Sequence, residues 1–253
     1  MAIDDGGHGI SGVRLIRRPP PGRPGSQPTM DNPGSIDLIS VNCGLPREVA
    51  WHGRSVTTAI YKEPLKGRVA LRTLNLDGDR QADLSVHGGA SKAVYCYPFA
   101  HYKYWKTELT GRELPFGSFG ENFTVEGLVE DSVHIGDRFA VGSAELVVTQ
   151  PRLPCYKLGL RFESDDMVRR FLASRRTGFY LAVIREGHVG AGDRIVLTDR
   201  EPISVPVPWI TRLYVAKKYS ADDVADVRRV LRASALPDSW KEYFRERLAR
   251  ISA

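Results

Sequence analysis

The feature that most constrains this chain is a long succession of short apolar runs, each bounded by turn-forming residues. Runs of about five residues between Gly, Pro, Asn or Asp are typical of β-strands. The runs predict strands at 36–41, 57–61, 68–71, 93–97, 122–125, 133–135, 139–141, 145–149, 179–184 and 194–197. We therefore expect a mainly β (α+β) fold over most of the chain.

Two Gly-Asp dipeptides, Gly136-Asp137 and Gly192-Asp193, each precede an arginine and a short apolar strand. Glycine supplies a positive φ, and aspartate can hydrogen-bond to nearby backbone. This combination favours two turns that begin strands over a functional pair of carboxylates.

Two helices are expected among the strands. The first follows Pro98 and ends before Gly111, and the second is capped by Ser164 and ends before Gly178. The apolar face of the first consists of Phe99, Tyr102, Trp105 and Leu109. The spacing of these side chains is helical, not alternating.

The pattern becomes helical after Pro202, Pro206 and Pro208, which suggest a hinge or linker. A short helix is expected at 210–217, a second after the cap Ser220, and a third after a capping box at 239–242. We expect three domains or segments: a disordered leader at 1–34, a β domain at 35–204 and a three-helix subdomain at 205–253. The leader is rich in Pro and Gly, and Met30 is a candidate start.

Charge and cysteine content exclude several classes of function. The net charge is +6, and residues 209–253 account for +4 of it, with ten Lys/Arg and six Asp/Glu. Basic residues are not interleaved with aromatic residues elsewhere, so we expect no nucleic-acid binding. No apolar run is long enough to span a membrane, and we expect no signal peptide because the N-terminal residues contain no continuous apolar region. The three separated cysteines predict no disulfide framework, which favours the cytoplasm.

Cys155 is the strongest candidate for chemistry. It follows an apolar strand, and Pro151 and Pro154 restrict the loop that carries it. Arg152 and Lys157 place two cations nearby, and cations favour the thiolate, the form that ligates metals. The alternative is a buried structural cysteine.

Two glycine-rich loops are further candidates. In the first, His87, Gly88, Gly89 and Lys92 precede a strand, and backbone amides with a lysine suit a phosphate. In the second, Asn122 could orient a polar substrate or a metal-bound oxygen. The alternatives are a tight turn with a solvated lysine and a turn capped by asparagine.

Taken in order, five motifs resemble the MOSC domain family, in its YiiM-like branch with a C-terminal three-helix domain. They are 42–47 (Asn-Cys-Gly-Leu-Pro-Arg), 83–89 (Asp-Leu-Ser-Val-His-Gly-Gly) with 92–95 (Lys-Ala-Val-Tyr), 120–128 (Gly-Glu-Asn-Phe-Thr-Val-Glu-Gly-Leu), 135–138 (Ile-Gly-Asp-Arg) and 150–155 (Gln-Pro-Arg-Leu-Pro-Cys). The resemblance runs from about Ile36 to the C-terminus.

This resemblance implies an irregular β-barrel around a molybdenum cofactor, molybdopterin with molybdenum, and no pyridoxal phosphate. It implies that Cys155 ligates the metal and that Asn122 lies near its open position. The expected cofactor-binding residues are His87, Gly88, Gly89, Lys92, Asn122, Phe123 and Arg152.

The resemblance further implies reduction of N-hydroxylated compounds such as N-hydroxylated purines. A separate flavin or iron–sulfur protein would donate the electrons, and it could dock on the basic C-terminal helices. Arg228, Arg229 and Arg232 are expected to form one exposed patch there. The alternative function is a carrier of the cofactor or of sulfur as a persulfide on Cys155.

Overall fold

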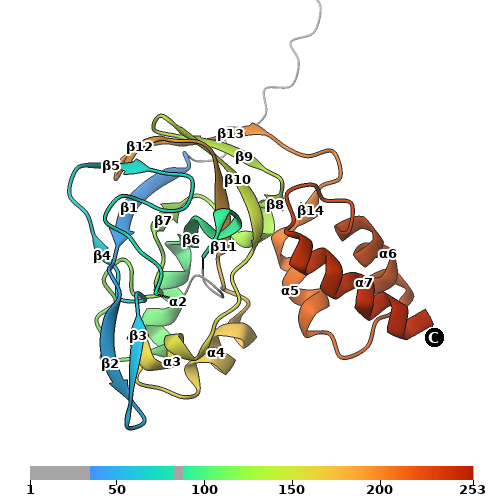
Figure 1. Ribbon diagram of the computed structural model, residues 1–253, viewed down its shortest axis with the longest axis horizontal. Coiled ribbons are helices and arrows are strands. Elements are labelled where there is room, and N and C mark those ends of the chain that lie inside the picture. The colour runs from blue at the N-terminus through green and yellow to red at the C-terminus, as the bar shows by residue number, and fades with distance from the viewer. Residues whose placement is uncertain (1–34, 83–87, 253) are drawn as a thin grey trace, which may run out of the picture. The chain divides into compact units, whose positions relative to one another are not determined.

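A mixed eight-stranded sheet forms the centre of the fold in the computed structural model, which describes residues 35–82 and 88–252 (Figure 1). All neighbouring strands are antiparallel except β6 and β7, which are parallel. The strand order is β13 (Ile195–Asp199), β9 (Arg138–Val141), β10 (Ala144–Pro151), β11 (Phe179–Arg185), β6 (Val94–Pro98), β7 (Phe123–Glu126), β1 (Asp37–Cys43) and β4 (Glu63–Pro64).

The sheet curls so that β1 meets the start of β13, although the two strands lie far apart in the strand order. Leu38 N–H donates to Asp193 O at 2.8 Å, Gly192 N–H donates to Leu38 O at 2.8 Å, and Ile195 N–H donates to Ile36 O at 2.8 Å. Backbone bonds across this seam satisfy groups that an open edge would expose. The mixed sheet and the helices confirm the expected α+β fold, and the seam is consistent with the expected irregular barrel.

The remaining strands form three short two-stranded ladders. They are β12 (Gly187–Gly190) with β5 (Arg68–Leu71), β14 (Val205–Pro206) with β8 (His134–Ile135), and the hairpin β2 (Arg47–Trp51) with β3 (Arg54–Thr58). The strand predicted at 57–61 overlaps β3 only at its start, and residues 59–62 continue as irregular chain. Strands β2, β4, β12 and β14 were not predicted, and two of them, β4 and β14, have only two residues each.

Both Gly-Asp dipeptides form turns, as predicted. Gly136 and Gly192 have φ values of 90° and 92°. Each aspartate accepts a hydrogen bond from the backbone N–H three residues earlier, at 2.9 Å in both turns. Each also binds an arginine from a distant segment: Arg200 at Asp137 and Arg68 at Asp193. The two carboxylates therefore fasten separate turns.

Helices α2 (Ala100–Glu108) and α4 (Met167–Ser174) confirm the two helices predicted among the strands. The cap of α4 is Asp166, two residues after the expected Ser164. A further helix, α3 (Tyr156–Phe162), was not predicted. It begins directly after Cys155 and ends at Glu163, which has a left-handed φ of 48°. Two short 3₁₀ helices, η1 (Ala90–Lys92) and η2 (Glu130–Ser132), complete this region.

The last part of the chain forms three helices, α5 (Val207–Val215), α6 (Ala221–Val230) and α7 (Asp238–Ser252). Ser220 caps α6 as predicted and accepts a hydrogen bond from Asp223 N–H at 3.1 Å. The predicted capping box of α7 is wrong, because Trp240 and Lys241 donate their N–H groups to Pro237 O and Ser239 lies inside the first turn.

The proline-rich segment before α5 is held in place and is not a free linker. Val205 and Pro206 pair with Ile135 and His134, and Val207 N–H donates to Val133 O at 2.9 Å. The same hydrophobic cluster contains strand residues such as Val148 and helix residues such as Phe244. The boundaries at 34/35 and 204/205 stay predictions, and residues 1–34 lie outside the described part of the chain.

A second cluster of buried side chains is mainly aromatic and lies beneath α2, α3 and α4. It contains Tyr95, Tyr97, Tyr102, Trp105, Leu114, Phe119, Leu158, Phe162, Met167 and Phe171. Among the described residues, no helix is both long enough and apolar enough to cross a membrane.

The irregular segment 59–62 packs tightly against three glycines. A Cβ on Gly44 would lie 2.4 Å from Tyr61 O, and one on Gly117 would lie 2.5 Å from Lys62 O. A Cβ on Gly120 would lie 2.9 Å from Ile60 Cγ1. The glycine-rich loop at 117–120 therefore provides space for another backbone, which no larger residue allows.

We expect Gly117→Ala to destabilise the protein more than Gly111→Ala, measured by urea denaturation. Both glycines have positive φ, but a Cβ on Gly111 would meet nothing within 4 Å. The left-handed backbone alone should cost about 1 kcal/mol at Gly111. The clash with Lys62 O should add about 2 kcal/mol at Gly117. Equal losses in the two variants would show that segment 59–62 adjusts freely.

Candidate functional site

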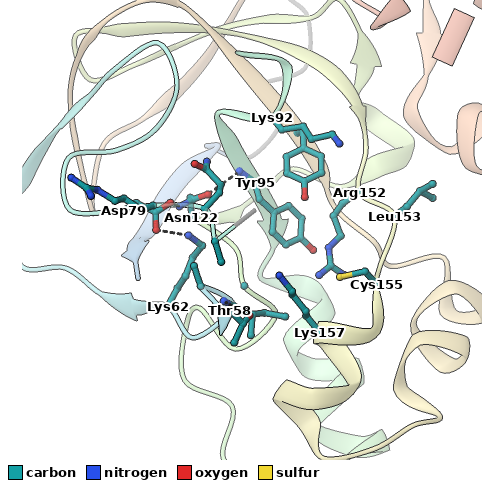
Figure 2. Close-up of a pocket in the computed structure, with 17 residues that line it drawn as sticks. Thr58, Lys62, Asp79, Lys92, Tyr95, Asn122, Arg152, Leu153, Cys155 and Lys157 are labelled. Atoms are coloured by element: carbon teal, nitrogen blue, oxygen red, sulfur yellow. Dashed lines mark hydrogen bonds and ion pairs between the residues drawn. The ribbon is translucent and has the colours of Figure 1, made fainter. Parts of the chain in front are cut away.

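A cavity opens between segment 58–62, the chain after β5, and the loop that joins β10 to α3 (Figure 2). Its empty volume is about 670 Å³, including open solvent. Of the described residues, five basic side chains and one carboxylate line it. They are Lys62, Arg80, Lys92, Arg152 and Lys157, and the carboxylate is Asp79. The excess of positive charge suits an anionic ligand.

Asp79 is the centre of a buried polar network on one wall. Its side chain binds the Lys62 ammonium and accepts hydrogen bonds from Gly44 N–H at 2.8 Å and from Asn122 Nδ2 at 2.9 Å. Asp79 is 2% exposed, so its charge needs these partners. The network fixes Lys62 at the edge of the cavity.

The side-chain amide of Asn122 is fully engaged with protein groups. Its Nδ2 donates to Asp79 and to Asn42 O at 3.2 Å, and its Oδ1 accepts from Tyr95 N–H at 3.1 Å. Asn122 thus joins β1, β6 and the segment before β7 where they meet at the cavity. Its predicted place beside an open metal position stays a prediction.

The neighbouring Glu121 is fully buried and holds the glycine-rich loop. Its carboxylate accepts from Gly117 N–H at 2.9 Å, Phe119 N–H at 3.1 Å, Thr124 Oγ1 at 3.0 Å and the Tyr102 hydroxyl. Burial raises the pKa of this carboxyl, and these hydrogen bonds favour its ionised form. Glu121 therefore fixes the conformation of the loop that forms part of the cavity wall.

Arg152 enters the cavity and forms no ion pair with a carboxylate of the described residues. The residue is 6% exposed, and its Nη1 nitrogen is buried with no hydrogen-bond partner in the described part of the chain. Its guanidinium carbon lies 5.2 Å from the ring centres of both Tyr95 and Phe171. Aromatic faces attract a cation but leave its N–H groups available. An unsatisfied buried cation beside a cavity indicates an anion site.

Cys155 lies at the other end of the same loop. Strand β10 ends at Pro151, and the Arg152 N–H donates to Gly178 O at 3.1 Å, so the loop leaves the sheet from a fixed point. Figure 2 shows the Cys155 sulfur and the Arg152 guanidinium directed at the same region of the cavity. Lys157, in the first turn of α3, is 8% exposed and lines the cavity beside them.

A hydrogen bond connects this loop to the C-terminal helices. Trp240 Nε1 in α7 donates to Gln150 Oε1 at 2.6 Å, and both side chains are buried. The amide nitrogen of Gln150 donates in turn to Ser91 O at 3.3 Å, next to Lys92. Burial lowers the pKa of Lys92. Gln150 therefore links Trp240 of α7 to Ser91, which precedes Lys92 in the chain.

The structure brings together four of the predicted site residues and separates the others. Lys92, Asn122, Arg152 and Cys155 line one cavity. Phe123 is buried in the core, and Gly88 and Gly89 are outside the lining. His87 lies outside the described residues.

Sequence reasoning missed Thr58, Lys62, Asp79 and Arg80 as parts of the lining. In the sequence, both Lys62 and Asp79 lie near glycine-containing turns. This position does not indicate that the two side chains meet. Within the described ranges, no group of three His, Cys, Asp or Glu side chains could hold a metal ion. A metal at Cys155 would need most of its ligands from a cofactor.

Comparisons with known proteins identify both parts of the chain. The family model described as "MOSC domain" matches residues 83–196, and the model described as "YiiM-like, 3-alpha helix domain" matches residues 219–250. The "Uncharacterized protein YflK" of Bacillus subtilis is 38% identical over 214 residues, which cover 85% of this chain and 95% of that protein.

Two further relatives add structural and functional context. The crystal structure of YiiM from Geobacillus stearothermophilus has a TM-score of 0.69 and 32% identity, and the match covers 84% of this chain and 99% of that chain. A Gibberella moniliformis protein named "Reductase" is 30% identical over 211 residues, which cover 82% of this chain and 37% of that protein.

We expect Arg152→Met to leave the free energy of unfolding of cofactor-free protein within about 1 kcal/mol of the parent, or above it. The variant loses the contacts of Arg152 with the aromatic rings, which lowers stability. It also removes a buried charge that has no ion-pair partner among the described residues, and the two effects offset each other.

The matched control is Lys62→Met, which leaves Asp79 buried without its cation and should cost about 3 kcal/mol. Urea denaturation measures both variants. A loss at Arg152 as large as that at Lys62 would show that the Arg152 charge is already compensated by the protein.

Proposed function

The chain belongs to the MOSC domain family, in the YiiM-like group with a 3-alpha helix domain, and on this premise we propose that it is a molybdenum-cofactor-dependent reductase. Its substrates are N-hydroxylated compounds, among them N-hydroxylated purines. The observation that carries this proposal is the buried, unpartnered Nη1 of Arg152 in the same cavity as the Cys155 thiol.

The residues of the cavity fit the cofactor. Molybdopterin carries a phosphate and a dithiolene, and both are anionic. Arg152 and Lys157 have no carboxylate partner among the described residues, so they can neutralise such groups. Cys155 supplies a soft sulfur ligand, which suits a metal that the dithiolene also binds. The phosphate would be held by Arg152 and Lys92.

The protein positions the cofactor, supplies positive charge and excludes water from one wall of the cavity. When bound, the molybdenum centre supplies the two-electron reductive cleavage of an N–O bond, which yields an N–H group and water. Cys155 anchors the metal from a loop restricted by prolines. Asp79 and Asn122 keep Lys62 in the wall, and the aromatic cluster behind Arg152 excludes water from that side.

The name and length of one relative support a redox role. The "Reductase" of Gibberella moniliformis matches this chain over 37% of its length, so most of that protein consists of other sequence. If additional sequence delivers the electrons, we expect a longer reductase in which one region is similar to this chain. This chain would receive them from a separate flavin or iron–sulfur protein in the cytoplasm.

A second candidate function is a carrier of the cofactor, or of sulfur as a Cys155 persulfide. The observation that favours it is that Cys155 is partly exposed at the start of α3, where another protein can reach it. Turnover of an N-hydroxylated substrate with a chemical reductant separates the two functions, because a carrier would show none.

We expect Cys155→Ala to lose molybdenum while retaining its fold. The protein is made in a host that synthesises the cofactor, and molybdenum is measured by mass spectrometry alongside the melting temperature. Cys43→Ala is the matched control, because Cys43 is a buried thiol outside the cavity lining and should leave molybdenum unchanged. Arg152→Met should also lower the molybdenum content. Stoichiometric molybdenum in Cys155→Ala would exclude the proposed metal ligand.

The electron donor is proposed to dock on the basic C-terminal helices. Arg228, Arg229 and Arg232 are exposed and line one shallow groove with Pro202 and Ile203. Arg229 Nε donates to Ile203 O at 2.8 Å, so its guanidinium is fixed in position. An acidic donor would be attracted to this patch at low ionic strength.

Replacing Arg228, Arg229 and Arg232 by Ser should slow turnover with an acidic protein donor by about tenfold at low salt. The deficit should shrink as salt is added, and turnover with a small chemical reductant should be unchanged. The control replaces Lys103, Lys106 and Arg112, which are exposed in or after α2. Equal rates in both triple variants would show that the patch has no docking role.

A further inference from the structure

Two arginines from distant parts of the chain meet on one tyrosine ring beside the cavity. The guanidinium carbon of Arg47, in β2, lies 3.6 Å from the ring centre of Tyr61. The guanidinium carbon of Arg161, in α3, lies 4.8 Å from the same ring centre. We call these three side chains the Arg47–Tyr61–Arg161 cluster. It places two positive charges close together.

Among the described residues, no acidic side chain forms an ion pair with either arginine. Within the described part of the chain, neither Arg47 nor Arg161 forms an ion pair or a side-chain hydrogen bond, and the Nε of Arg161 is buried without a partner. Burial lowers the pKa of Arg161, and the nearby charge of Arg47 lowers it further, whereas Tyr61 and the buried carboxylate of Glu121 act in the opposite direction. A protein that brings two like charges together without a counter-ion gains from an anionic ligand.

The cluster is continuous with the cavity. Tyr61 lies between Ile60 and Lys62, both of which line it. Arg161 lies one turn after Lys157 on α3, so the two share a face of the helix. The cluster itself lies outside the lining. It is therefore connected to the lining through Lys62, the residue after Tyr61, and through Lys157, one turn before Arg161.

The hairpin that carries Arg47 is held against the helical region at a second point. His52, at the tip between β2 and β3, contacts Asp165 before α4, with 2.8 Å between Nε2 and Oδ1. Figure 1 shows the β2–β3 hairpin beside α3. The separation of the two arginines is thus set by the fold on both sides of Tyr61.

We propose that Arg47 and Arg161 bind a phosphate group of the substrate, so that the reductase acts on N-hydroxylated nucleotides. This inference rests on the proposed function and names its substrate class. Guanidinium groups bind phosphate through paired N–H donors, and two of them can share one phosphate. The reacting N–OH group then lies toward Cys155, and the phosphate lies at the rim.

The first experiment measures binding without catalysis. Isothermal titration of the purified protein compares adenosine 5′-monophosphate with adenosine, and we expect the nucleotide to bind at least about tenfold more tightly. Arg161→Gln and Arg47→Gln should each remove most of this difference. Arg54→Gln is the matched control, because Arg54 is an exposed arginine on the same hairpin with no ring contact.

Equal binding of nucleotide and nucleoside by the parent would overturn the inference, as would retention of the difference in both variants. Arg47 is exposed, so its variant keeps the test valid if Arg161→Gln fails to fold. These outcomes leave the proposed reductase function untouched, because the titration needs no turnover.

The second experiment identifies the source of the phosphate. Molybdenum content should be the same in the parent, Arg47→Gln and Arg161→Gln, whereas a loss in either variant would assign the cluster to the phosphate of the cofactor and overturn the substrate class. With a chemical reductant, both variants should raise the KM for N-hydroxylated adenosine monophosphate about tenfold and leave that for the nucleoside unchanged. Equal changes for both substrates would also overturn it.

Discussion

The buried carboxylate of Asp79 is the interaction on which the rest of the cavity depends. It binds Lys62, the Gly44 N–H and the Asn122 amide, and Asn122 in turn binds backbone groups of Asn42 and Tyr95. One negative charge thus joins irregular chain to the ends of three strands. Because this charge is buried, removing any one of its partners leaves it incompletely compensated, at a large cost in desolvation free energy. The wall therefore behaves as a single unit.

Much of the fold could be predicted from sequence because it depends on local signals. Short apolar runs bounded by turn residues predicted most strands of the large sheet, and Ser220 predicted the start of α6. The errors have physical causes. Helix α3 is too short to show a periodic face, and it ends on a left-handed Glu163 that the sequence does not mark. Helix α7 begins after Pro237, so its apparent capping serine, Ser239, lies inside the first turn.

The candidate site was predictable only where its residues belong to one motif or one loop. Arg152 and Cys155 are three residues apart, and the roles proposed for them follow from the loop that carries them. Lys62 and Asp79 meet across 17 residues, and Arg47 and Arg161 meet through Tyr61 over a much longer stretch. Such pairs depend on tertiary packing, particularly on the glycines that admit segment 59–62, and one sequence does not reveal them.

The hydrogen bond between Trp240 and Gln150 has a consequence for the ancestry of such proteins. Both groups are buried, so exchanging the helical region for an unrelated one would leave the Gln150 oxygen without its donor beside the loop of Arg152. A gene fusion that replaced only the C-terminal part would therefore have to repair the β part as well. Recombination should preserve the two parts together, and additional sequence should be gained at the ends of the pair and not between them.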